Sequence, residues 1–118
     1  MDILEFFKDA DFVEDIASGA KIFEEGQEGD TMYVIMEGEV DLLINGQSID
    51  SAGPGGMIGE MALIDSSLRS ATAIAKTACR VVPLDESGFI FMVQENPLFS
   101  IHVMRVLADR LRRMNTRI

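Results

Sequence analysis

The chain has 118 residues, of which 47% are apolar and 25% charged, with one cysteine and a net charge of −10. These values indicate a single domain with a modest core, exclude an internal disulfide, and leave no apolar run near the roughly 20 residues that span a membrane. The acidic N-terminus is unlike a signal peptide. We therefore expect one cytoplasmic domain, residues 1–118, with no membrane partner.

The charge is unevenly distributed along the chain. Residues 1–97 hold 19 acids and 5 bases, whereas residues 98–118 hold 1 acid and 5 bases. Affinity for nucleic acids depends on clustered Lys and Arg that neutralise phosphates. An acidic body repels DNA, and no helix-turn-helix follows the last predicted helix before Ile118. We expect no nucleic-acid binding by this chain itself.

Short β-type runs dominate the first two thirds of the chain. Residues 3–8 predict a short helix, and from Phe12 to Val82 the runs are separated by glycine-containing turns. Asn45-Gly46, between 40–44 and 47–50, is the strongest hairpin signal, because a type I′ turn needs positive φ at both central residues. Several short strands at this spacing indicate a small barrel or sandwich.

After Leu84 the pattern changes to helical periodicity. Asp85 is a suitable N-cap for a helix over 86–95, which we expect to bury Phe89, Ile90, Met92 and Val93. Pro97 separates it from a helix over 98–117. That helix has apolar residues three or four apart, which predict its docking face: Leu98, Ile101, Met104, Ala108, Leu111 and Met114.

The segment from Gly59 to Thr72 carries most of the functional information. Its apolar start predicts one or two helical turns, whose first N–H groups suit an anion, and a glycine lets the backbone approach it. Arg69 adds a planar fork of donors that matches phosphate. Glu60 would be unfavourable beside an anion unless the ligand also offers hydroxyls. A nucleotide, with a sugar hydroxyl and one phosphate, satisfies both side chains.

The segment reads Gly59-Glu60-Met61-Ala62-Leu63 and then Leu68-Arg69-Ser70-Ala71-Thr72. It closely resembles the phosphate-binding cassette of the cyclic-nucleotide-binding domain family, Gly-Glu-Leu/Met-Ala-Leu followed by Pro-Arg-Ala/Ser-Ala-Thr. The resemblance extends over about residues 11–113, through strand motifs at 22–35 and 38–40 and the turn at 53–55. Leu68 stands where the family usually has proline, and the N-terminal helical segment is shorter than usual.

The resemblance implies a mainly β fold with flanking helices. We expect a β jelly roll over about residues 11–84, with a short phosphate-binding helix, and two C-terminal helices over about 85–117. The implied ligand is cyclic AMP or cyclic GMP. The ligand-binding residues are expected to be Gly59, Glu60, Met61, Ala62, Arg69, Ser70 and Ala71, with Met57 and Met114 able to touch the base.

Ser70 bears on the choice of nucleotide. In the family, a threonine directly after the arginine often favours cyclic GMP, because its hydroxyl can bond the guanine amino group. Alanine or serine there is common in cyclic AMP binders, so Ser70 favours cyclic AMP without excluding cyclic GMP. Ser70 could also be only a small residue at the start of a strand.

Other residues have simpler explanations. Glu60 and Arg69 alone could be a surface ion pair, although the motifs around them favour ligand binding. His102 has no nucleophile or second ligand near it in sequence, and the acids of 24–30 lack the spacing of a calcium loop. Neither a zinc cluster nor a nucleoside-triphosphate loop is present. We expect no catalytic residue, no metal and no cofactor.

The arginines of the last helix allow three interpretations: Arg105, Arg110, Arg112, Arg113 and Arg117. They could form a solvated face that complements the helix dipole, they could dock on the acidic body or a partner, or the helix could close over the purine with Arg110, Met114 or Asn115. We expect charge alone to give this helix little attachment to the barrel.

These observations predict a regulatory sensor that passes a helix rearrangement to an unknown protein partner, or to a second copy in a homodimer. Two alternatives remain open. One is a jelly-roll interaction protein that does not bind nucleotide, and the other is a truncated transcription regulator.

Overall fold

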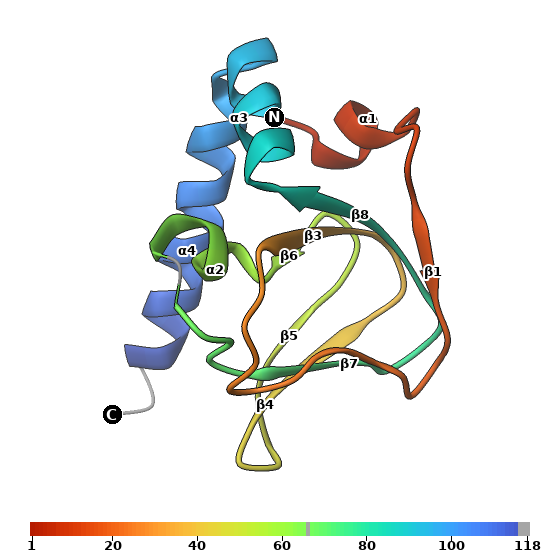
Figure 1. Cartoon of the computed structure of the whole chain (residues 1–118), viewed down its shortest axis with the longest axis vertical. Coiled ribbons are helices and arrows are strands. Elements are labelled where there is room, and N and C mark those ends of the chain that lie inside the picture. Colours follow the sequence, from red (N-terminus) through yellow and green to blue (C-terminus); the bar gives the residue numbers. More distant parts are fainter. Residues whose placement is uncertain (66, 116–118) are drawn as a thin grey trace.

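The computed structural model describes residues 1–65 and 67–115. Within them, the strands form two antiparallel four-stranded sheets, with the helices at the left and along the top of the view (Figure 1). The strands are β1 (Glu14–Ile16), β2 (Lys21–Phe23), β3 (Thr31–Glu37), β4 (Val40–Ile44), β5 (Gln47–Ala52), β6 (Met57–Ile58), β7 (Thr72–Ala75) and β8 (Cys79–Asp85). The first sheet has the order β1-β8-β3-β6 and the second β2-β7-β4-β5. The helices are α1 (Ile3–Phe7), α2 (Glu60–Asp65), α3 (Glu86–Glu95) and α4 (Leu98–Asn115). This is the expected jelly roll with flanking helices.

Two core clusters follow from the alternation of side chains along the central strands. In β3, Met32 and Val34 face the helices and Ile35 faces the opposite sheet. In β8, Val82 and Leu84 likewise pack toward the helices, while Val81 points into the barrel. Because successive strand residues point to opposite faces, each central strand supplies both clusters. The first sheet is therefore a shared wall between the barrel and the helices.

Two local predictions are confirmed. Asn45 and Gly46 connect β4 to β5 with φ angles of 51° and 78°, as a type I′ turn requires. The carboxylate of Asp85 accepts a hydrogen bond from the Gly88 N–H at 2.8 Å and caps α3. One detail was wrong: Phe89, Met92 and Val93 pack against the core, but the Ile90 side chain is exposed.

The predicted docking face of α4 was also wrong. Phe99 and Val103 are buried against β3 and β8 residues in the helix-side core, and Val106 and Leu107 pack beside them. Burial of each of the larger side chains contributes about 1.5–3 kcal/mol. The predicted stripe instead points largely to solvent, with exposed Leu98, Ile101, Met104, Leu111 and Met114. The helix ends at Asn115, and Arg117 lies outside the described residues.

No helix among the described residues is long and apolar enough to cross a membrane.

Candidate functional site

A cavity of about 280 Å³ lies between α2, the segment that leads into β7, and the C-terminal half of α4. Leu42, Ile44 and Ile49 of the β4–β5 hairpin line one side of it, and Leu111 and Met114 of α4 line another. Glu60, Arg69 and Arg110 supply its charged groups. The volume is near the lower end of the roughly 300–1,000 Å³ typical of small-molecule sites.

Arg69 is a buried cation held in a fixed position. The residue is 7% exposed, and its Nη1 and Nη2 atoms donate to the carbonyls of Gly59 at 3.2 Å and Thr31 at 2.7 Å. The guanidinium carbon lies 4.3 Å from the centre of the Phe23 ring. The backbone is fixed as well, because the Arg69 N–H donates to the Gln27 carbonyl at 2.8 Å. The cation thus stays in place without a carboxylate partner among the described residues.

Burial lowers the pKa of Arg69, and the nearby Tyr33, Asp30 and Glu60 only partly oppose that effect. The protonated guanidinium is therefore a desolvated charge, which an anion in the cavity would stabilise.

Two glycines make room for the Arg69 side chain. Gly59 has φ +78°, and a Cβ atom there would lie 2.7 Å from Arg69 Nη1. A Cβ on Gly29 would overlap the same guanidinium group. The start of α2 and the turn before β3 are therefore built around this arginine.

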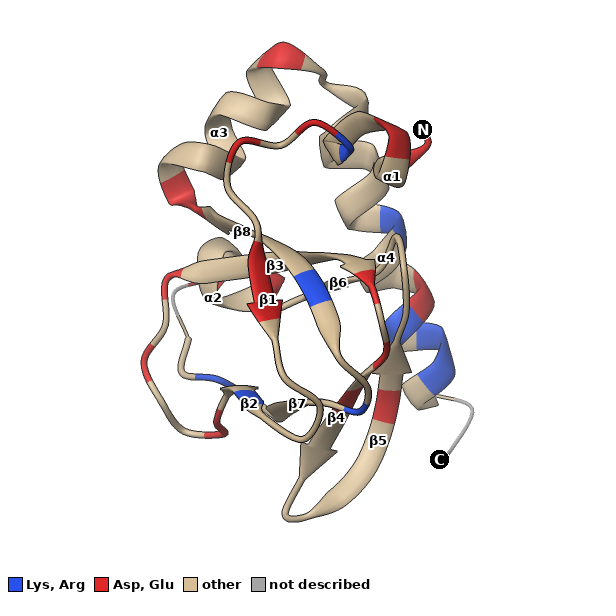
Figure 2. Ribbon diagram, turned by 90° about the vertical axis from the view of Figure 1, so that its right-hand side faces the viewer, with Lys and Arg blue, Asp and Glu red and all other residues tan. Residues whose placement is uncertain are grey.

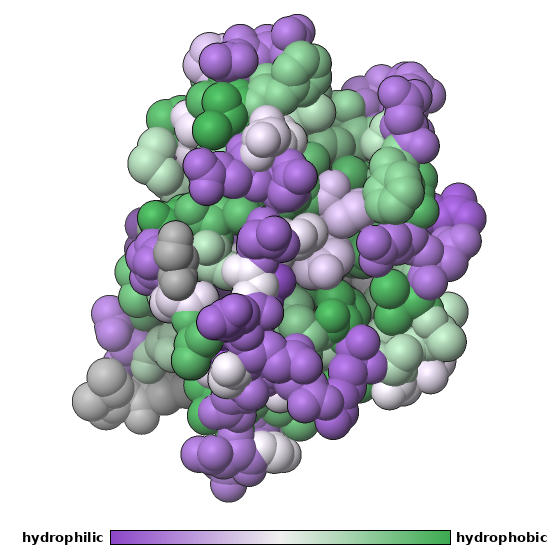
Figure 3. All heavy atoms as spheres, in the orientation of Figure 1, coloured by the Kyte–Doolittle hydropathy of each residue, from purple (hydrophilic) through white to green (hydrophobic). Residues whose placement is uncertain are grey.

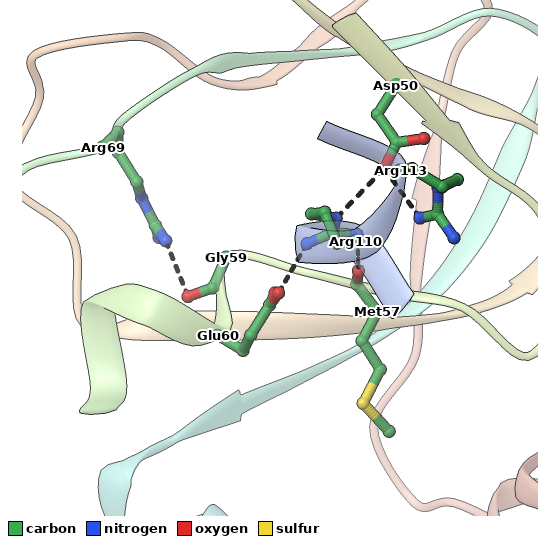
Figure 4. A network of polar contacts seen from close by, with 7 residues as sticks. All are labelled: Asp50, Met57, Gly59, Glu60, Arg69, Arg110 and Arg113. Atoms are coloured by element: carbon green, nitrogen blue, oxygen red, sulfur yellow. Dashed lines mark hydrogen bonds and ion pairs between the residues drawn. The ribbon is translucent and has the colours of Figure 1, made fainter. Parts of the chain in front are cut away.

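Glu60 is the buried acid of the cavity, with 1% of its surface exposed. Its Oε1 accepts a hydrogen bond from Arg110 Nη1 at 2.5 Å, whereas its Oε2 has no partner among the described residues (Figure 4). An unsatisfied buried carboxylate oxygen is costly, so a donor supplied by a ligand would be favourable here. A hydroxyl group has the required chemistry.

Arg110 fastens α4 to the barrel through three contacts. Besides Glu60, it donates from Nε to Asp50 Oδ2 at 3.1 Å and from Nη2 to the Met57 carbonyl at 2.9 Å (Figure 4). Arg113 donates to the same Asp50 oxygen at 2.9 Å. Burial alone would raise the pKa of Asp50, but hydrogen bonds from Arg113, the Ser51 backbone and Arg110 hold it below its usual value. The expectation that charge gives this helix little attachment was wrong.

Most of the predicted ligand residues line this one cavity: Gly59, Glu60, Met61, Ala62, Arg69, Ser70, Ala71 and Met114. Met57 does not, because its side chain is fully buried in the helix-side core and only its carbonyl faces Arg110. Phe23, Gly29 and Leu111 were not predicted. The spacing of Phe23 and Gly29 from Arg69 in the sequence gives no signal, since only the fold brings them together.

A second, more open hollow of about 520 Å³ lies near the turn before β3 and α2. Its lining includes the carboxylates of Glu28, Asp30 and Glu86, and no basic residue within 1–65 or 67–115 contributes to it. Three carboxylates disfavour an anionic ligand, so this hollow is a poor candidate for a phosphate site.

Comparison with known proteins agrees with this geometry. The profile of the cyclic nucleotide-binding domain family matches residues 13–96. A CRP-like cAMP-activated global transcriptional regulator of Mycobacterium tuberculosis is 33% identical over 106 residues, which cover 86% of this chain and 47% of that protein. The chain thus spans about half the length of that relative.

Solved structures show the same fold. A cyclic nucleotide-binding domain from Methylobacillus flagellatus superposes with a TM-score of 0.79 and 27% identity, covering 90% of this chain and 65% of that one. A cAMP-bound structure of PfPKA-R superposes with a TM-score of 0.76 and 26% identity, covering 96% of this chain and 43% of that one. From the cassette, the jelly roll and these matches together, the chain belongs to the cyclic nucleotide-binding domain family.

Proposed function

We propose that the chain is a regulatory sensor that binds cyclic AMP in the cavity beside α2. The observation that carries the proposal is that one cavity holds both a cation without a carboxylate partner and a carboxylate oxygen without a hydrogen-bond donor from residues 1–65 and 67–115. Arg69 is a buried cation without an ion-pair partner among the described residues, and Glu60 has a buried oxygen that lacks a donor. A cyclic nucleotide offers both a phosphate anion and a free ribose 2′-hydroxyl.

The rest of the cavity suits a purine. The β4–β5 side and α4 present aliphatic and thioether side chains, which favour a flat, weakly polar ring: Leu42, Ile44, Ile49, Leu111 and Met114. Ser70 is exposed at the cavity wall, where its hydroxyl could meet the phosphate or a base edge. Serine at this place favours cyclic AMP, by resemblance to other members of the family.

Isothermal titration with cyclic AMP and cyclic GMP tests the proposal. We expect saturable binding of one nucleotide per chain, with cyclic AMP the tighter ligand. Ser70→Thr should reduce the preference for cyclic AMP over cyclic GMP. It should strengthen the cyclic GMP complex, since a threonine hydroxyl can bond the guanine amino group. Absence of saturable heat with both nucleotides would contradict the sensor function and favour a jelly-roll interaction protein.

Arg110 connects the residues of the cavity to helix α4, so ligand binding can affect the position of that helix. A ribose hydroxyl that binds Glu60 Oε2 changes the charge distribution on the carboxylate that Arg110 holds through Oε1. A phosphate on Arg69 changes the start of α2 through the Gly59 carbonyl. The ligand then shifts the position of α4 by its differential affinity for two arrangements of the contact. In this scheme the chain binds and signals and does not catalyse a reaction.

The exposed stripe of α4 supports self-association. Exposed Ile101, Met104 and Leu111, together with the half-buried Ala108, follow a spacing of three, four and three residues, which is the pattern of a helix-pairing seam. A homodimer through α4 would cover these side chains and place two cavities beside the interface. Sedimentation should then show a dimer that Met104→Glu dissociates. A monomer at all concentrations would contradict the homodimer, and a different protein would then be the candidate partner for the stripe.

A further inference from the structure

An aromatic groove is separate from the nucleotide cavity, with which it shares no lining residue. It runs between the segment after α1, the end of β8 and α3, and its volume is about 460 Å³. The rings of Phe6, Phe7, Phe12 and Phe91 line it, together with Met92 and Leu84. The groove therefore contains four of the seven phenylalanines of the chain.

Two of these rings are unusually exposed. Phe12 has 65% and Phe91 54% of its surface open to solvent, and neither stacks on another ring of the described chain. In Figure 3, apolar atoms are visible at the upper right, over the segment after α1, with hydrophilic groups beside them. Covering apolar surface releases about 25 cal/mol per Å². Binding of a partner that covers the groove is therefore favoured by the hydrophobic effect.

The charged residues that line the groove are all acidic. Asp9, Asp11 and Glu95 line it, and no Lys or Arg of the described residues does. None of these three carboxylates forms an ion pair with a residue in 1–65 or 67–115. Figure 2 shows acidic residues on the segment after α1 and on α3, while basic residues gather on the C-terminal half of α4. The basic residue at the end of α1, Lys8, is paired with Glu5. An occupant with positive charges around an apolar face matches this surface.

We propose that this groove docks a basic amphipathic helix of a protein partner. Acidic rims repel nucleic acids and anionic membranes, which excludes those occupants on charge. No buried polar side-chain atom without a partner lies in the groove, since the two such atoms of the described chain belong to Glu60 and His102. Specificity must then come from apolar anchors and flanking charges, as in helix-in-groove recognition.

The location of the groove gives docking a consequence. Phe91, Met92 and Glu95 belong to α3, which begins at the Asp85 cap directly after β8. A helix bound there holds α3 against the end of β8. If the chain is a nucleotide sensor as proposed, the partner and the nucleotide influence each other's affinity equally, because such coupling is reciprocal. Docking itself does not depend on that function.

Fluorescence anisotropy with the full chain tests the docking. The probe is a labelled synthetic helix with leucines on one face and Lys and Arg elsewhere, and the control probe keeps the leucines but carries Glu in place of the basic residues. We expect the basic probe to bind without nucleotide and the acidic probe to bind at least about tenfold more weakly. Failure of the basic probe to bind, or equal binding of both probes, would overturn the proposal.

Two variants locate the binding. Asp11→Lys with Glu95→Lys should weaken the basic probe by about tenfold or more, whereas the matched reversal of Glu28 and Glu37, outside the groove, should change it by about threefold or less. Equal effects would mean unspecific attraction to an acidic protein and would overturn the proposal. Phe12→Ser should weaken the probe while leaving the melting temperature unchanged or higher, because the ring is largely exposed. Unchanged probe binding by Phe12→Ser would also count against the groove.

Discussion

Replacing Arg69 with alanine should weaken cyclic nucleotide binding far more than it weakens the fold. The side chain is nearly buried and held by two backbone carbonyls, and Arg110, the other cation of the cavity, is already paired with Glu60 and Asp50. Loss of Arg69 therefore leaves the proposed phosphate in a partly dry cavity without an available cation. Truncation of one partner of such a charge pair costs about 2–5 kcal/mol. At about 1.4 kcal/mol per factor of ten, affinity should fall between about 30-fold and several thousand-fold.

The effect on stability is expected to be smaller, because two contributions oppose each other. Arg69→Ala removes donors from the carbonyls of Gly59 and Thr31 and the contact with the Phe23 ring. It also removes a cation whose pKa is lowered by burial, and therefore a desolvation cost. The net loss in the free energy of unfolding should not exceed about 2 kcal/mol.

Isothermal titration with cyclic AMP, together with thermal unfolding, measures both quantities. Arg80→Ala is the matched control, because Arg80 is an exposed arginine that pairs with Asp15 on β1 and does not line the cavity. The control should bind like the wild type. Arg69→Lys should fall between wild type and alanine, since lysine keeps the charge without the planar fork. If Arg69→Ala binds as tightly as wild type, the phosphate site is elsewhere.

Three further predictions follow from the polar network. Glu60→Ala should weaken the binding of cyclic AMP, and the wild type should bind 2′-deoxy cyclic AMP poorly. The two losses in binding free energy should not add in titrations, because both changes remove the same hydrogen bond. Arg110→Ala should lower the free energy of unfolding by about 2–4 kcal/mol and speed amide exchange in α4, whereas Arg112→Ala, an exposed control that pairs within the helix, should do neither. Asp50→Asn should destabilise the protein by about 1–2 kcal/mol at neutral pH. The pKa of Asp50 is lowered in the folded state, so the stability difference between wild type and Asp50→Asn should be constant at pH values above the unfolded-state pKa of about 3.9. It should shrink as the pH falls through the folded-state pKa. Chemical unfolding at several pH values would measure this difference.

Local signals in the sequence predicted the parts of the fold that local physics determines. The Asn45-Gly46 turn and the Asp85 cap need only their own neighbours, and both form as predicted. The cassette from Gly59 to Thr72 was visible as a motif of fixed spacing. Its residues lie around one cavity in the structure, although their contacts with a ligand remain predictions.

Predictions that depended on the choice between two faces were less successful. Helix α4 carries two apolar stripes at helical spacing, one through Phe99 and Val103 and another through Ile101 and Met104. Periodicity identifies a helix but does not say which stripe meets the barrel, because that depends on the shape of the partner surface. Arg110 contacts Glu60 and Asp50 across 50 and 60 residues of sequence, so no local pattern in the sequence reveals these contacts.

The most direct test of nucleotide binding by Arg69 and Glu60 is a set of ¹H–¹⁵N correlation spectra recorded during titration with cyclic AMP. The side-chain Nε–H of Arg69 and the amides of 59–62 should shift and saturate together at one nucleotide per chain, because these groups line the cavity that we propose holds the phosphate and ribose. The amides of β1 should shift least, since this edge strand contributes no residue to the cavity lining. Absence of saturable shifts at Arg69 and 59–62, or larger shifts around Phe91 in the aromatic groove, would contradict the account.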